Sequence, residues 1–118
     1  MMSGVITMPV EQFEALVADA LDGIPDGLGR AMENVAVVVD DLSPSGRLLG
    51  LYEGVPRTRR GNHYSASTPA RITIYMATIC EACRTTRDVV ELVRKTVIHE
   101  IGHHFGIDDQ RLEELGWA

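Results

Sequence analysis

The spacing of apolar residues near the start of the chain predicts an amphipathic helix. Between Met8 and Leu21, apolar side chains recur every three or four positions, with acidic residues between them. The stripe consists of Phe13, Leu16, Val17, Ala20 and Leu21. The segment 24–27, Ile-Pro-Asp-Gly, then predicts a turn. We therefore expect an N-terminal helix with one face on a core.

The middle of the chain predicts two or three short strands. A continuously apolar run from Val35 to Val39 is typical of a strand buried on both faces. Leu48 to Glu53 is expected to form a second strand. Arg71 to Met76 alternates at period two, which predicts a strand with one face on the core. Between them, Val55 to Pro69 is rich in glycine, proline and polar residues, and we expect a long loop.

A second, longer helix is expected from Thr86 to Phe105. Thr85 or Thr86 can cap its start, and Gly106 ends it. Its expected buried stripe consists of Val90, Val97, Ile101 and Phe105. A short helix from Asp109 to Leu115 follows. This order predicts a single α+β domain over residues 1–118, with a small mixed or antiparallel sheet packed on the two longer helices.

The composition of the chain and its lack of long apolar runs argue against nucleic acids and membranes as partners. The chain has 118 residues and a formal net charge of −6, which disfavours nucleic acid because a phosphate-binding surface needs clustered Lys and Arg. No apolar run approaches the roughly 20 residues that span a bilayer, and the N-terminus lacks the basic start of a signal peptide. Two cysteines, Cys80 and Cys83, fit a reducing compartment as free thiols. The sequence thus predicts a cytoplasmic protein with neither nucleic-acid nor membrane partners.

One motif in the predicted helix 86–105 contains residues that can bind a metal ion and act as a general base. His99-Glu100-Ile101-Gly102-His103 matches H-E-x-x-H. Residues four apart lie about 40° apart around a helix axis, so both imidazoles face one side and can bind one zinc ion. Glu100 points about 100° away from His99, which places it beside the metal as a general base on zinc-bound water.

A catalytic zinc site needs a third protein ligand. Three residues after Gly106 comes Asp109, ten positions after His99. In metzincin-type proteases a third histidine occupies that position. A carboxylate can replace it, so the spacing favours Asp109, with Asp108 as the neighbouring alternative. The expected cofactor is one Zn²⁺ per chain, held by His99, His103 and Asp109.

These residues resemble the zincin superfamily of metallopeptidases, and the chain looks like a family of small single-domain bacterial zincin-like metallopeptidases. The resemblance covers most of the chain, including 49–54, 71–75 and 111–116. It implies a minimal zincin fold and the hydrolysis of peptide bonds. With 118 residues the chain has little left for specificity subdomains, so we expect a shallow cleft that favours small or unfolded polypeptides. Metzincins carry a methionine turn after the third ligand, and the sequence departs from this pattern because no methionine stands between Asp109 and Ala118.

The resemblance also implies where a substrate would bind. Zincins pair extended substrate with an edge strand beside the cleft, and Arg71, Ile72, Thr73, Ile74 and Tyr75 form the best candidate for that strand. A donor to the oxyanion would help catalysis. Tyr64, His63, Tyr75 and Arg71 are the candidates for this donor.

Two other functions remain open. Zincin-like endoribonucleases resemble this segment in ligand spacing, but they lack a glutamate after the first histidine and need a basic surface. A non-catalytic zinc-binding interaction module is the other alternative, although a structural site does not need Glu100. His104 is expected to face the core side as a structural histidine.

Overall fold

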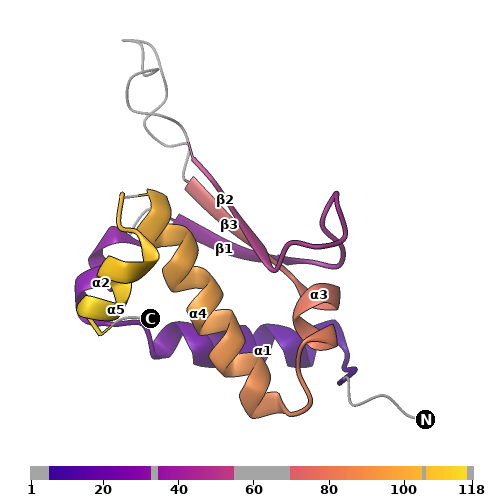
Figure 1. The fold of residues 1–118 in the computed structure, drawn as a ribbon. Coiled ribbons are helices and arrows are strands. Elements are labelled where there is room, and N and C mark those ends of the chain that lie inside the picture. Colours follow the sequence, from indigo (N-terminus) through magenta and orange to yellow (C-terminus); the bar gives the residue numbers. More distant parts are fainter. Residues whose placement is uncertain (1–5, 33–34, 55–69, 105, 117–118) are drawn as a thin grey trace.

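The computed structural model describes residues 6–32, 35–54, 70–104 and 106–116, which form a small sheet with helices packed beneath it (Figure 1). The helices are α1 (Val10–Asp22), α2 (Asp26–Ala31), α3 (Met76–Glu81), α4 (Thr86–His104) and α5 (Asp109–Glu114). The strands are β1 (Val35–Asp40), β2 (Gly50–Glu53) and β3 (Ala70–Tyr75). The architecture is α+β, as the order of apolar patterns predicts.

The sheet is mixed and has the strand order β1-β3-β2. β1 runs parallel to β3, with Val37 opposite Ile72, whereas β2 runs antiparallel to β3, with Tyr52 opposite Ile72. The Tyr75 N–H donates to the Leu49 carbonyl at 3.0 Å and extends this ladder by one residue. β3 is therefore the central strand, and β1 and β2 are the two edges.

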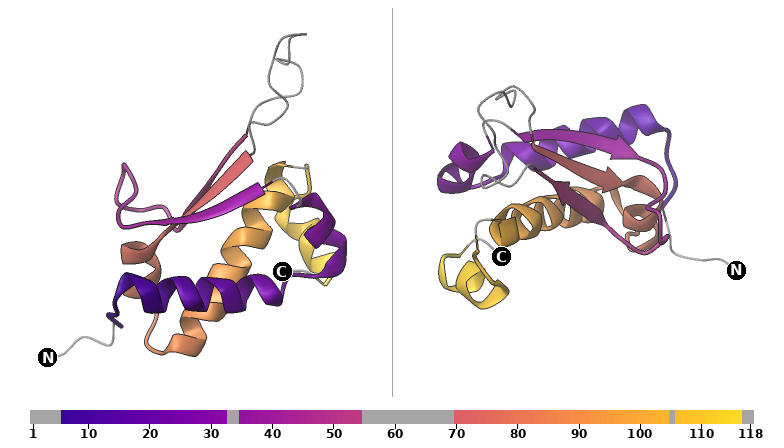
Figure 2. Two further views of the ribbon diagram at one scale, coloured as in Figure 1. Left: turned by 180° about the vertical axis from the view of Figure 1, so that it is seen from behind. Right: turned by 90° about the horizontal axis from the view of Figure 1, so that it is seen from above.

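Two burial predictions for the strands are wrong. β1 alternates between half-buried and exposed residues, and Val38 is 39% exposed, so this strand is not buried on both faces. β3 is buried at four successive positions, Ile72, Thr73, Ile74 and Tyr75, rather than on one face alone. The reason is the strand order. The helices α1 and α4 cover one face of the sheet (Figure 2), so an edge strand keeps its other face exposed, while β3 has neighbours on both sides.

The core lies between the sheet and the two long helices. α1 contributes Phe13, Val17 and Ala20, as its apolar spacing predicts, and the sheet contributes Ile72 and Ile74. α4 contributes Val89, Val93, Val97 and Ile101, all fully buried and each four residues from the next. Of the stripe expected on α4, Val97 and Ile101 are confirmed, Val90 is only half-buried, and Phe105 lies outside the described residues.

The start of α4 is fixed by a reciprocal cap. The Asp88 N–H donates to Thr85 Oγ1 at 3.0 Å, while Asp88 Oδ2 accepts the backbone N–H groups of Arg84 and Thr85 at 3.1 and 3.2 Å. This is a capping box in which aspartate takes the place of glutamate. It identifies Thr85 as the capping residue, one of the two that the sequence allows.

Three other outcomes concern the connections. The turn expected at 24–27 is only partly correct, because Ile24 and Pro25 connect the helices while Asp26 and Gly27 already belong to the short helix α2, which the apolar spacing does not predict. The expected long loop, 55–69, lies outside the described residues. Within the described ranges, no helix is both long enough and apolar enough to cross a lipid bilayer.

Candidate metal centre

The last two turns of α4 present two imidazoles on the same side. His99 and His103 are four residues apart, their ring centroids lie 4.0 Å apart, and the ring planes are inclined by 51°. Their side chains are 44% and 50% exposed. The pair therefore opens to solvent rather than into the core, where Val97 and Ile101 point.

The end of α4 turns the chain back toward these histidines. Gly106 has a φ of +78°, a conformation that side chains with a Cβ rarely adopt. Its N–H donates to the His103 carbonyl at 3.0 Å, and the Ile107 N–H donates to the Gly102 carbonyl at 2.7 Å. These two bonds form the glycine-terminated helix end that the sequence predicts.

A second glycine fixes α5 against α4. A Cβ at Gly102 would lie 3.1 and 3.2 Å from the two methyl groups of Leu112, which is buried. The absence of a side chain at Gly102 therefore lets Leu112 pack directly on α4. Because Leu112 lies one turn into α5, this contact determines where the first residue of α5, Asp109, is placed.

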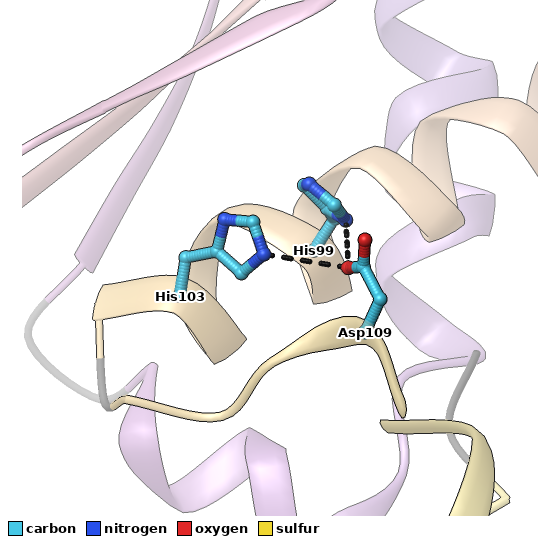
Figure 3. A group of neighbouring side chains, drawn as sticks. All are labelled: His99, His103 and Asp109. Carbon is cyan, nitrogen blue, oxygen red and sulfur yellow. Dashed lines mark hydrogen bonds and ion pairs between the residues drawn. The ribbon is translucent and has the colours of Figure 1, made fainter. Parts of the chain in front are cut away.

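The two neighbouring aspartates have different partners. Asp108 is the N-cap of α5, and its Oδ1 accepts the Arg111 N–H at 2.8 Å. Asp109 Oδ1 lies 3.0 Å from His99 Nδ1 and 3.3 Å from His103 Nε2 (Figure 3). Of the two candidates for a third ligand, the geometry therefore brings Asp109 to the histidines and assigns Asp108 to the helix cap.

The arrangement of these three side chains fits a zinc ion. One ligand atom from each of His99, His103 and Asp109 lies within 4.8 Å of the others. Two imidazole nitrogens and one carboxylate oxygen are a donor set that catalytic zinc sites use, and ligands of a tetrahedral zinc ion lie about 3.4 Å from one another. The two separations from Asp109 Oδ1, 3.0 Å to His99 Nδ1 and 3.3 Å to His103 Nε2, are close to that spacing.

Glu100 has a partner that the sequence does not reveal. Its Oε1 accepts the backbone N–H of Tyr52 at 3.0 Å, across 48 positions of sequence. Tyr52 belongs to the edge strand β2, so the carboxylate lies between α4 and the sheet. No motif could have identified this contact, because a backbone N–H is present at almost every residue and only the packing selects one.

We call His99, His103 and Asp109 the metal group. A cavity of about 540 Å³ adjoins this group. It is lined by Lys95, Ile98, His99, Asp109, Leu112 and Glu113. Two of the three candidate ligands thus face the same open space, between the exposed side of α4 and the start of α5. A ligand of the metal could enter from this space.

The strand predicted to pair with substrate is not available for that role. Arg71 to Tyr75 belong to β3, whose two sides already pair with β1 and β2. Because a strand with two neighbours has no free edge, this prediction is wrong, and the edge beside α4 is β2.

Of the four expected oxyanion donors, the described part of the chain includes Arg71 and Tyr75, and it brings neither of them to the candidate metal ligands. Arg71 donates to Glu53 at 2.8 Å, a hydrogen bond that raises the pKa of its guanidinium. Tyr75 is buried at the end of β3, and neither residue lines the cavity beside the metal group. His63, Tyr64 and the side chain of His104 lie outside the described part of the chain.

The two cysteines lie outside the site. Cys80 and Cys83 are buried free thiols, which confirms the expected state. Burial raises the pKa of both thiols, so the reactive thiolate is suppressed at neutral pH.

Comparison with known proteins identifies the family of the chain. A family model described as zincin-like metallopeptidase matches residues 32–117, more than half of the chain. Among solved structures, a conserved hypothetical protein from Thermus thermophilus is similar, with 25% sequence identity and a TM-score of 0.56 over 92% of this chain and 97% of that one. No curated protein matches the chain. The family match contains the metal group, Glu100 and the β2 edge, and the chain therefore belongs to the zincin-like metallopeptidase family.

Proposed function

We propose that this protein is a zinc-dependent peptidase that cleaves small or unfolded polypeptides. The observation that carries the proposal is the convergence of His99, His103 and Asp109 at the surface, with the Glu100 carboxylate on the same helix end. Two histidines and a carboxylate leave one position of a tetrahedral zinc ion open, as catalytic sites do and structural sites do not.

The zinc ion would be held by His99, His103 and Asp109, and when bound it lowers the pKa of water and polarises a peptide carbonyl. The remaining chemistry belongs to Glu100. Its Oε1 accepts the Tyr52 N–H, so Oε2 is the oxygen left to take a proton from the attacking water. The same oxygen then delivers that proton to the departing amine.

The exposure of the candidate site favours an extended and flexible substrate. The side chains of His99, His103 and Asp109 are 44%, 50% and 72% exposed, and the adjoining cavity is open along α4. A site this exposed imposes little shape selection on its own. A peptide segment that can adapt its backbone reaches it more readily than the surface of a folded protein.

The test compares native protein with Glu100→Gln, each loaded with one equivalent of zinc, on dye-labelled casein as an unstructured substrate. Glutamine has nearly the shape of glutamate but cannot accept the proton. We expect zinc binding to be unchanged and the cleavage rate to fall by about 10²- to 10⁴-fold, the usual contribution of a general base.

The control is His99→Ala, which we expect to lose both zinc and cleavage. Equal cleavage by native protein and Glu100→Gln would contradict the peptidase. One equivalent of zinc without Glu100-dependent cleavage would instead support a zinc-binding interaction module. Native metal content in His99→Ala would contradict the metal site itself.

A further inference from the structure

β2 and α4 meet at Gly50, where a side chain has no room. A Cβ at this position would lie 2.7 Å from Thr96 Cγ2 and 3.2 Å from the Thr73 carbonyl oxygen. Thr96 cannot easily move aside, because it is only 8% exposed and its Oγ1 donates to the Leu92 carbonyl at 2.7 Å. The missing side chain at Gly50 therefore sets how closely the edge strand approaches α4.

This contact lies next to the one that holds Glu100. Tyr52 follows Gly50 by two residues, about 6.6 Å along a strand, and Glu100 follows Thr96 by four residues, about 6 Å along a helix. The two spacings match, so strand and helix meet twice: Gly50 on Thr96, and the Tyr52 N–H on Glu100 Oε1 at 3.0 Å. A displacement at the first contact is carried to the second.

We propose that Gly50 is a positioning residue for Glu100. The lack of a side chain at Gly50 keeps β2 close enough to α4 for the Tyr52 N–H to hold one carboxylate oxygen. The other oxygen is thereby oriented for proton transfer, a consequence that rests on the proposed peptidase function. A methyl group at Gly50 pushes β2 away from Thr96, lengthens this hydrogen bond and leaves the Glu100 side chain without a fixed direction.

The test uses a pair of variants that introduce the clash with Thr96 and then relieve it, while the milder 3.2 Å approach to the Thr73 carbonyl oxygen stays the same in both. Gly50→Ala adds the methyl group that meets Thr96 Cγ2. The second variant, Gly50→Ala with Thr96→Ser, removes that Cγ2 and keeps the hydroxyl that binds the Leu92 carbonyl. Gly23→Ala is the matched control, because the added Cβ there would meet the flexible Arg94 side chain at 3.3 Å, away from the site.

The first measurement is amide hydrogen exchange in the metal-free protein. We expect the Tyr52 amide to exchange about 10- to 100-fold faster in Gly50→Ala, because it loses a hydrogen bond to a charged acceptor. The double variant restores slow exchange, and Gly23→Ala leaves it unchanged. The Tyr75 amide, bonded to the Leu49 carbonyl, stays protected throughout and shows that the β2–β3 ladder is intact.

The second measurement is cleavage of dye-labelled casein by the zinc-loaded proteins. We expect Gly50→Ala to lower kcat about tenfold with KM and zinc affinity unchanged, since small misplacements of a catalytic group are costly. Thr96→Ser in the double variant restores kcat. A purely structural role for Gly50 would instead change thermal stability without this rescue of turnover.

The outcomes separate the two proposals. Native Tyr52 exchange in Gly50→Ala overturns the positioning role, whatever the enzyme does. If Gly50→Ala does not fold, the double variant decides, because its failure to fold or to protect Tyr52 also overturns the proposal. Equal casein cleavage by native protein and Glu100→Gln contradicts the peptidase, while the exchange at Tyr52 still decides whether Gly50 controls this hydrogen bond.

Discussion

Asp108 and Asp109 are adjacent carboxylates, and one position along the chain separates a helix cap from a candidate metal ligand. Asp108 Oδ1 accepts the Arg111 N–H, whereas Asp109 Oδ1 faces both histidines. A residue at the N-cap directs its side chain back along the helix to satisfy a free N–H group. The next residue is already helical and points outward, and here that direction is toward His99 and His103.

The same substitution at both positions tests this division. Asp109→Asn replaces a charged ligand oxygen with an amide, and we expect zinc affinity to fall more than about 100-fold, beyond the 10- to 100-fold typical of residues that only support ligands. Asp108→Asn is expected to leave zinc affinity within about twofold, since asparagine caps helices as well as aspartate does. Titration against a chromogenic chelator measures both. The reverse order of effects would make Asp108 the ligand.

At the scale of single elements, α4 depends on a cap at the end opposite its two candidate metal ligands. The capping box at Thr85 and Asp88 lies at the opposite end of the helix from His99 and His103. Because four N–H groups at a helix start lack partners within the helix, such a cap fixes the first turn and resists fraying. Because the capped helix is rigid, it holds His99 and His103 in a defined position at its other end.

This cap makes the stability of α4 dependent on pH. Backbone N–H donors from Arg84 and Thr85, together with the Thr85 hydroxyl, hold the pKa of Asp88 below its usual value of 3.8. A carboxylate whose pKa is lowered on folding stabilises the protein above the unfolded pKa, and this contribution is lost as the pH falls through the folded pKa. We therefore expect Asp88→Asn to lower the free energy of unfolding at pH 7, and the difference from native protein to shrink below about pH 4.

Urea unfolding at pH 7 and pH 3 measures this effect. Thr85→Ala is the control, because the threonine hydroxyl does not titrate in this range. Its loss is expected to cost about 1 kcal/mol, and a cost persists at low pH. A difference between Asp88→Asn and native protein that is the same at both pH values would contradict the role assigned to the Asp88 charge.

For the whole molecule, a metal bound by His99, His103 and Asp109 would link α4 to α5 and add to the contacts that already hold these two helices together. α5 contacts α4 through Leu112 against Gly102, and through the turn at Gly106. A ligand that binds the folded protein and not the unfolded chain stabilises it by mass action. Here the ligand set spans α4 and α5, so the stabilisation would include the docking of the last helix.

We expect zinc at 100 times its dissociation constant to add about 2.7 kcal/mol of stability, which corresponds to a Tm increase of roughly 10 °C for a chain of this size. Thermal unfolding followed by circular dichroism, with and without zinc, measures the shift, and EDTA should reverse it. His99→Ala is expected to show no shift. An equal shift in that variant would place the stabilising zinc elsewhere on the protein.

Local sequence determined most of the metal group. The spacing of His99 and His103 places two imidazoles on one side of any α-helix, and Gly106 allows the left-handed turn that brings Asp109 back to them. These features depend on residues within eleven positions of one another, over which helix geometry and turn preferences are sufficient. The apolar stripe of α1 and the start of α4 are likewise local and were predicted correctly.

Tertiary structure decided everything that depends on residues far apart in the chain. Which strand lies in the centre, and therefore that β3 has no free edge, follows from pairings that periodicity does not encode. The Tyr52 N–H reaches Glu100 across 48 positions, and Gly50 meets Thr96 across a similar separation. The physical reason is that side-chain spacing specifies which face of an element is apolar, whereas only the packing of faces against each other selects which backbone group meets which side chain.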